Sequence, residues 1–176
     1  TNDVPIPSAN NKTLNEIFDE GNLVVNGDFS DGTTGWVAFN SSHSVVDGNL
    51  INVGTGASDT PLSFKDVTST LNDKWYYNSR LTILNNNATS IKVVFNNATG
   101  GNLTINTPVI SQPYEFSGVV THVNGTFIRT NFQHLYADAN TSIGNQLEID
   151  YLLATNLTSL GIDNLTQAEM DALYER

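Results

Sequence analysis

The chain has 176 residues, a formal net charge of −11, seven Lys and Arg against 18 Asp and Glu, and no cysteine. This length fits one domain, and so acidic a chain is a poor partner for nucleic acid or anionic membrane surfaces, which bind basic patches. The absence of cysteine excludes disulfides, thiolate catalysis and Cys-ligated zinc, and no apolar run approaches the ~20 residues of a membrane span.

The first elements in chain order are a linker and a short helix. Residues 1–12 contain Pro and Asn without periodicity, which is typical of a linker. Thr13 and Glu16 then form a capping box at the start of an apolar helical face. We therefore expect a helix over residues 13–20, and one domain over residues 13–176.

From residue 22 to residue 154, short β-branched or aromatic runs alternate with Gly, Asn, Asp or Pro roughly every 8–12 residues, which is typical of an all-β sandwich. Asp47-Gly48 and Asn124-Gly125 lie between apolar runs, and each predicts a hairpin. The expected strands are residues 22–26, 36–40, 43–47, 49–54, 61–67, 74–84, 90–96, 102–106, 113–121, 126–135 and 146–154.

The C-terminal segment returns to a helical pattern. Thr166 and Glu169 form a second capping box, and Leu165 and Met170 occupy the positions of a hydrophobic staple. The sequence therefore predicts a helix over residues 165–175. Because a short isolated helix is marginal in water, we expect it to pack on the sandwich or on a neighbouring chain or domain.

Segments near both ends of the chain resemble one family of domains. Residues 21–36 read GNLVVNGDFSDGTTGW, which resembles the opening of jelly-roll carbohydrate-binding modules. Three later segments resemble the end of the variant carried by tail and baseplate proteins of phages infecting Gram-positive bacteria: HLYADAN (134–140), LEIDYLL (147–153) and LTQAEMDALY (165–174). The resemblance covers residues 14–176 and implies a galactose-binding-like jelly-roll β-sandwich with short N- and C-terminal helices.

The resemblance also implies roles for residues of the opening and closing segments. The tryptophan that ends the opening segment usually packs inside these modules, so we expect Trp36 in the core. Such modules often hold a structural Ca²⁺ between the first turn and the last strand, bound by carboxylates and carbonyls. The matching positions are Asp28, Ser30 and Asp150, although Ser30 stands where many relatives carry Glu, and Asp28 is also explained as a turn-forming residue.

No motif marks a catalytic site. None of the acids lies in a context typical of a glycosidase, whose two carboxylates face each other across about 5–10 Å. The sequence has no G-x-S-x-G motif, and its three histidines lack the spacing of a metal site. We therefore expect a protein that is not an enzyme.

Side chains suited to sugar recognition concentrate in two of the expected strands. Aromatic rings stack on the apolar face of a pyranose, while Arg, Asn, Gln and His pair with its hydroxyls. We expect the two strands to bring such residues to one surface, with the last two at its margin. The candidate ligand-binding residues are Trp75, Tyr77, Arg80, Arg129, Asn131, Gln133, His134 and Tyr136.

Structural explanations stay open for several of these residues. Trp75, Tyr76 and Tyr77 are also explained as part of the sandwich core. His134 and Tyr136 are also explained as a clamp that orders the end of a strand. Alternation puts successive side chains of a strand on opposite faces, but it does not say which face of the first strand meets a ligand.

The resemblance implies a non-catalytic carbohydrate-binding module of a phage tail or baseplate protein, located in the virion and adsorbing to host cell-surface polysaccharide. Its other partners would be tail or baseplate subunits, or other domains of a longer chain. The acidity fits a neutral sugar better than an anionic teichoic acid, because phosphate recognition uses Arg and Lys clusters. Two alternatives stay open: a spacer or assembly domain of a tail fibre without ligand, and a targeting module of a secreted or cell-surface bacterial glycoside hydrolase.

Overall fold

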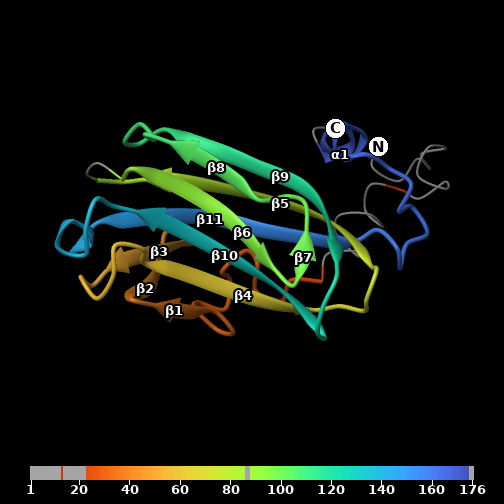
Figure 1. The fold of residues 1–176 in the computed structure, drawn as a ribbon, viewed down its shortest axis with the longest axis horizontal. Coiled ribbons are helices and arrows are strands. Elements are labelled where there is room, and N and C mark those ends of the chain that lie inside the picture. The colour runs from red at the N-terminus through yellow and green to blue at the C-terminus, as the bar shows by residue number, and fades with distance from the viewer. Residues whose placement is uncertain (1–12, 14–22, 86–87, 175–176) are drawn as a thin grey trace.

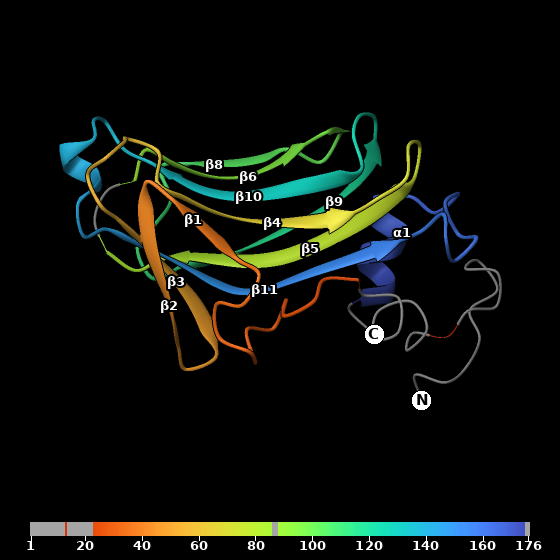
Figure 2. The ribbon, with the colours of Figure 1, turned by 90° about the horizontal axis from the view of Figure 1, so that it is seen from below.

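The computed structural model describes residues 13, 23–85 and 88–174, and these form a sandwich of two antiparallel sheets (Figures 1 and 2). The expected linker, and the expected N-terminal helix beyond Thr13, lie outside the described residues. The strands are β1 (Val37–Phe39), β2 (Ser41–Val46), β3 (Asn49–Gly54), β4 (Leu62–Thr68), β5 (Lys74–Ile83), β6 (Ser90–Asn96), β7 (Ala98–Thr99), β8 (Leu103–Asn106), β9 (Pro113–His122), β10 (Phe127–Leu135) and β11 (Gln146–Asn156).

One sheet has five strands in the order β1-β4-β10-β6-β8, and the other has six in the order β2-β3-β11-β5-β9-β7. The predicted hairpin at Asp47-Gly48 is confirmed: it joins β2 to β3, and both turn residues have positive φ angles, 52° and 86°. The hairpin predicted at Asn124-Gly125 is wrong. This turn leads from β9 in the six-stranded sheet to β10 in the five-stranded sheet, so it crosses the sandwich instead of closing a pair.

The main core lies between the sheets, where alternate residues of each strand meet. Trp36 is buried there, as the sequence predicted, and its ring centroid lies 5.1 Å from that of Phe29 and 5.8 Å from that of Phe132. Its indole Nε1–H donates a hydrogen bond of 2.9 Å to the carbonyl of Asn26. This bond satisfies the polar atom of a buried indole, so the ring fills the core without an unpaired donor.

The described residues of the expected first strand, 23–26, do not form a strand, and residues 25 and 26 lie in a turn. The backbone beside β11 makes isolated bonds, from Leu23 N to Ala154 O at 2.9 Å and from Leu152 N to Gly27 O at 2.8 Å. A Cβ atom at Gly27 would lie 2.2 Å from the Leu152 carbonyl oxygen, so only glycine allows this approach. The segment therefore follows the edge of β11 but turns away before a ladder forms.

A β-bulge interrupts β11 where it pairs with β5. Ile149 pairs with Leu81 and Tyr151 pairs with Arg80, which leaves Asp150 as an extra residue between them. Asp150 and Tyr151 therefore both lie on the outer side of the sheet, although they are consecutive.

The predicted C-terminal helix is observed as α1 (Gln167–Tyr174), which packs at one end of the six-stranded sheet (Figures 1 and 2). The predicted capping box is confirmed: Glu169 Oε2 accepts the Thr166 backbone N–H at 2.8 Å, and Thr166 Oγ1 accepts the Glu169 backbone N–H at 3.3 Å. A second apolar core lies between α1, the loop before it and the sheet. Its buried members are Tyr76, Leu157, Ile162, Leu165, Met170 and Leu173. In the part of the chain that the structure describes, no helix has the length and apolarity to cross a membrane.

Candidate functional site

The outer face of the five-stranded sheet, hereafter the five-stranded face, carries the polar side of β10. Arg129 and Gln133 point outward there while Phe132 and His134 are buried, as the sequence alternation predicted. Residues that pair directly across strands share a face, so the register defines this surface. Its rows are Phe39, Leu62, Gln133, Lys92 and Thr104; Val37, Phe64, Asn131 and Val94; and Asp66, Arg129 and Asn96.

Arg129 is held flat on this face by two kinds of contact. Its guanidinium carbon lies 3.9 Å from the ring centroid of Phe64 and 5.6 Å from that of Phe127. Its Nε and one terminal nitrogen donate to the two carboxylate oxygens of Asp66 at 2.7 and 2.8 Å. These hydrogen bonds raise the pKa of Arg129 above its usual value, so the planar cation stays charged and fixed in orientation.

The rest of the surface combines amides with exposed apolar side chains. Asn131 is buried, and its Nδ2 donates to the Val94 carbonyl at 3.0 Å, which fixes β10 against β6. Gln133 is half-buried between Leu62 and Lys92. On β1, Phe39 keeps 56% of its surface exposed, so the apolar strip continues to the edge of the sheet.

Trp75 and Tyr77 do not belong to an exposed surface, which corrects their assignment as ligand-binding residues. They are 0% and 2% exposed in the main core, with the ring centroid of Tyr77 4.7 Å from that of Phe95. The Trp75 indole donates to Ser69 Oγ at 2.9 Å. Neither ring offers a face to a ligand, because the core of the sandwich must be filled by large apolar side chains.

His134 and Tyr136 are buried as well. They therefore order the end of β10, as the structural explanation predicted, and are not exposed for ligand binding. His134 Nε2 lies 2.7 Å from Asn52 Oδ1, and its Nδ1 lies 2.8 Å from the Tyr136 hydroxyl. Asn52 Nδ2 in turn donates to Ser63 Oγ at 2.6 Å. Burial lowers the pKa of His134 to about 3. The neutral imidazole thus joins β10 of one sheet to β3 of the other.

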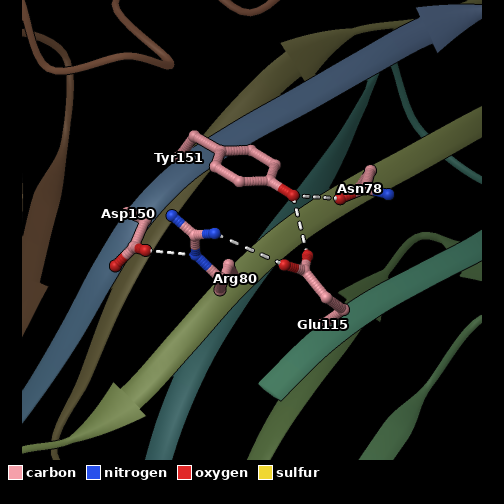
Figure 3. A network of polar contacts seen from close by, with 5 residues as sticks. All are labelled: Asn78, Arg80, Glu115, Asp150 and Tyr151. Carbon is pink, nitrogen blue, oxygen red and sulfur yellow. Dashed lines mark hydrogen bonds and ion pairs between the residues drawn. The ribbon is translucent and has the colours of Figure 1, made fainter. Parts of the chain in front are cut away.

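Arg80 lies on the opposite side of the molecule, on the outer face of the six-stranded sheet, hereafter the six-stranded face. Its Nε donates to Asp150 on the bulge of β11, and its terminal nitrogen lies 3.7 Å from Glu115 of β9 (Figure 3). The Tyr151 hydroxyl lies between Glu115 and Asn78. Since β5 and β10 belong to different sheets, the single surface predicted from Arg80 and Arg129 does not exist.

The three candidate calcium ligands have other partners. Asp28 Oδ1 accepts the Ser30 backbone N–H at 3.2 Å and the Ser30 hydroxyl at 2.9 Å, and these bonds lower the pKa of Asp28. Asp150 forms an ion pair with Arg80. Among the residues that the structure describes, no three acidic or histidine side chains gather in a group able to hold a metal ion. Asp28 is thus bonded as a turn-forming residue and Asp150 is paired with a cation, while calcium binding by Asp28, Ser30 and Asp150 stays a prediction.

No protein-family model matches the chain, and no curated protein matches it. Solved structures do share its architecture. One described as "CBM4 structure and function" is 12% identical, with a TM-score of 0.57 over 76% of this chain and 99% of that chain. TmCBM61 in complex with β-1,4-galactotriose is 11% identical, with a TM-score of 0.57 over 77% of this chain and 98% of that chain. The fold is the jelly roll of carbohydrate-binding modules.

This jelly roll also occurs within larger proteins. The enzymatically active domain of tailspike protein 4 of bacteriophage CBA120 is 13% identical, with a TM-score of 0.54 over 77% of this chain and 21% of that chain. At such identities these structures establish the fold, which the sequence predicted, and leave the ligand to be argued from the surface.

Sequence reasoning missed the aromatic part of the five-stranded face. Leu62, Phe64 and Asp66 alternate along β4 and share its outer side. The period-2 pattern of this segment was a usable signal for that shared side. What the pattern did not contain was the register that sets Asp66 beside Arg129.

Proposed function

We propose that this domain is a non-catalytic carbohydrate-binding module whose ligand lies on the five-stranded face. The observation that carries the proposal is the planar Arg129, stacked on Phe64 and fixed by both oxygens of Asp66. Flat aromatic and guanidinium surfaces suit the apolar face of a sugar ring, and the ring-binding surface is already ordered before a ligand arrives. Phe39 and Gln133 extend this surface along the same rows.

The charge of this face supports a neutral polysaccharide as the ligand class. Lys92 and Arg129 point outward from it against Asp66, in a chain whose net charge is −11. The amide of Gln133 and the ammonium of Lys92 offer donors to sugar hydroxyls beside the stacking surface. A teichoic acid would need a cluster of Arg and Lys side chains, whereas Arg129 is already neutralised by its carboxylate partner.

The parent protein we propose is a phage tail or baseplate protein that adsorbs to host cell-surface polysaccharide, with tail or baseplate subunits as its other partners and the virion as its location. The closing segments of the sequence and the fold shared with a phage tailspike support this origin. A targeting module of a secreted glycoside hydrolase has comparable support, because an arabinose-bound α-L-arabinofuranosidase shares the fold with a TM-score of 0.58 at 8% identity, over 79% of this chain and 26% of that chain. The sequence of the full-length gene and its neighbours distinguishes the two.

The test is a pull-down with purified cell walls and a glycan array, followed by affinity measurements on folded variants. Arg129→Gln and Phe64→Ala should each weaken binding by about 1–3 kcal/mol, the scale of a stacked or charge-assisted contact. Arg80→Gln is the matched control, since it removes the same cation from the six-stranded face, and it should leave glycan binding unchanged. Saturable binding that survives both five-stranded-face variants would contradict the proposed site. Negative results across many walls and glycans would favour the spacer or assembly alternative.

A further inference from the structure

A hollow of 310 Å³ opens at the edge of the five-stranded sheet, between β4 and the segment that precedes β1. We call it the edge pocket. The preceding segment contributes two exposed apolar side chains, Leu23 and Val25, and the second half of β4 contributes the rest. The lining residues are Leu23, Val25, Lys65, Asp66, Val67 and Thr68.

Lys65 is the one basic side chain of the edge pocket, and it points towards the core between the sheets. Buried and exposed residues alternate along this part of β4, so Lys65 is only 7% exposed while Asp66 and Thr68 point outward. Its Nζ lies against Gly35, where a Cβ atom would come within 2.5 Å of it. The centroid of the Trp36 ring lies 5.9 Å from the same Nζ. The ammonium group is therefore enclosed by a glycine, an indole ring and the pocket.

The described residues supply no acceptor for this ammonium group. None of their carboxylate or carbonyl oxygens accepts a hydrogen bond from Lys65 Nζ, and their ion pairs belong to Arg80 and Arg129. The Trp36 ring lies at the outer limit of a cation–π contact, about 6 Å, and its indole has no acceptor to offer. Burial lowers the pKa of Lys65, because the charged form has lost water without gaining a partner. The N–H donors of Lys65 are thus available to a ligand.

The edge of β4 beside Lys65 carries further donors. β1 pairs with only the first three residues of β4, so among the described strands the rest of β4 has a neighbour, β10, on one side alone. The Ser69 N–H donates to the Thr126 carbonyl on the β10 side, and the backbone groups of successive residues alternate in direction. The N–H groups of Asp66 and Thr68 therefore point to the open edge, where no described backbone group pairs with them.

The charges around the edge pocket favour a ligand with a single negative charge. Asp66 is the one acid among the lining residues, and both of its carboxylate oxygens accept hydrogen bonds from Arg129 on the outer face. A ligand therefore meets one unpaired ammonium group, with a carboxylate nearby that opposes a second negative charge. A phosphate or sulfate dianion would need a cluster of Arg and Lys side chains. The remaining lining is largely apolar and suits the body of an organic acid.

We propose that the edge pocket binds the carboxylate group of a small monocarboxylate. The carboxylate accepts hydrogen bonds from the Lys65 ammonium group and from the free N–H groups at the edge of β4, and the body of the ligand lies against Leu23 and Val25. Hydrogen bonds between charged partners are about twice as strong as those between neutral ones. The volume is at the lower end for small-molecule sites, which fits one sugar ring or one amino acid.

The experiment is a calorimetric titration of the folded domain with D-glucuronate and, separately, with N-acetyl-L-leucine. The first probe carries its carboxylate on a sugar ring and the second on an apolar body, so the tighter of the two identifies the source of the ligand. Glucose is the control without a carboxylate, and inorganic phosphate is the control for anions in general. At least one carboxylate should bind in a saturable way that salt weakens, and both controls should bind at least about tenfold more weakly.

Lys65→Met separates binding from folding, because it removes the ammonium group and keeps an unbranched apolar side chain. It should weaken carboxylate binding by about tenfold or more, the loss expected for a charge-assisted hydrogen bond. Its melting temperature should equal or exceed that of the parent, since the variant no longer buries a charge. Lys74→Met is the matched control: it removes the same cation from β5 of the other sheet, and should leave the affinity unchanged.

A second pair of variants tests the rim of the edge pocket without touching the core. Val25→Asp places a negative charge at the rim and should weaken carboxylate binding, whereas Val46→Asp places it at an exposed position of β2 and should not. The proposal is overturned if neither carboxylate binds, if glucose or phosphate binds equally well, or if Lys65→Met binds normally. It does not depend on the proposed glycan surface, because Phe39→Ala should weaken polysaccharide binding and leave carboxylate binding intact.

Discussion

Each outer face of this sandwich carries an arginine paired with a carboxylate, but the surroundings of the two arginines differ. On the five-stranded face, Arg129 lies flat on Phe64 and presents a plane. On the six-stranded face, Arg80 lies between Asp150 and Glu115, and forms part of a line of polar contacts that leads to α1. One face therefore offers an open, rigid surface, while the other is partly covered by the chain itself. An arginine with a carboxylate partner is therefore not by itself a sign of a ligand site. Both arginines also lie over a ring, but the guanidinium carbon of Arg129 is 3.9 Å from the Phe64 centroid, whereas that of Arg80 is 5.9 Å from the Tyr151 centroid.

The largest expected effect tests whether α1 truly covers the six-stranded face. Met170 is buried in the second core, so Met170→Ala should lower the free energy of unfolding by about 2–5 kcal/mol, the usual cost of a large-to-small change in a core. Chemical denaturation measures this. On the uncovered five-stranded face, the exposed Thr104→Ala should change stability by less than about 0.5 kcal/mol. If Met170→Ala were equally silent, α1 would not be docked and the contrast between the faces would be lost.

The next prediction concerns buried His134, whose contact with Asn52 joins the two sheets. His134 has a pKa of about 3 in the folded protein, against a usual 6.5, so the folded state favours its neutral form. The stability this group contributes is complete above pH 6.5 and falls as the pH drops below it, by about 1.4 kcal/mol per pH unit, or roughly 2 kcal/mol by pH 5. Unfolding measured from pH 7 to pH 5 should show this slope.

Replacing His134 provides the control for that slope. His134→Gln should be less stable at pH 7, since it breaks the contacts with Asn52 and Tyr136, but its stability should depend less on pH. Burial also lowers the pKa of His43, which contributes to the slope in both proteins. Equal slopes in the two proteins would mean that His134 is not the acid-sensitive group.

A smaller effect tests how far the five-stranded face extends. Phe39→Ala at the exposed edge strand should weaken polysaccharide binding by about 0.5–1.5 kcal/mol, the value of one aromatic contact, with little loss of stability. Val46→Ala is the matched control, because Val46 is similarly exposed on β2 of the other sheet. Affinity for the polysaccharide found in the pull-down is the measurement. An effect of Val46→Ala as large as that of Phe39→Ala would place the contact elsewhere.

The smallest expected effect concerns calcium. Because Asp28 is bonded to Ser30 and Asp150 to Arg80, excess chelator should leave the melting temperature unchanged. An ion held by the native state would instead stabilise it by mass action, and chelation would then lower the melting temperature. A drop of several degrees that Asp150→Ala also abolishes would establish the calcium site that the resemblance implied.

The sequence predicted the strands well because their period, length and punctuation are local properties. It also predicted correctly that Arg129 and Gln133 share a side of β10, since alternation along one strand is fixed by the pleat. It failed where two strands had to be placed relative to each other. Arg80 and Arg129 were expected on one surface, but β5 and β10 lie in different sheets. Neighbouring strands are chosen by the packing of the whole core, which no local pattern contains.

The same limit explains the aromatic residues. Trp75 and Tyr77 are residue types that often stack on sugars, but in this fold their rings fill the core between the two sheets. Phe64 and Phe127 were overlooked, although they lie beside Arg129, because their importance depends on the register between β4 and β10. Residue type alone therefore does not distinguish a ring that fills a core from one that supports a ligand.

The bulge in β11 bears on how this sequence can change by insertion and deletion. Ile149 before the bulge and Leu152 after it both face the core. Asp150 is therefore the one residue of β11 that has no partner in the register with β5. Loss of Asp150 would leave an uninterrupted strand with the same inward side chains, whereas loss of Leu152 would turn the following residues to the wrong side. The strand thus tolerates a one-residue length change where Arg80 finds its carboxylate partner. Related chains could gain or lose that ion pair in a single step without refolding the sheet.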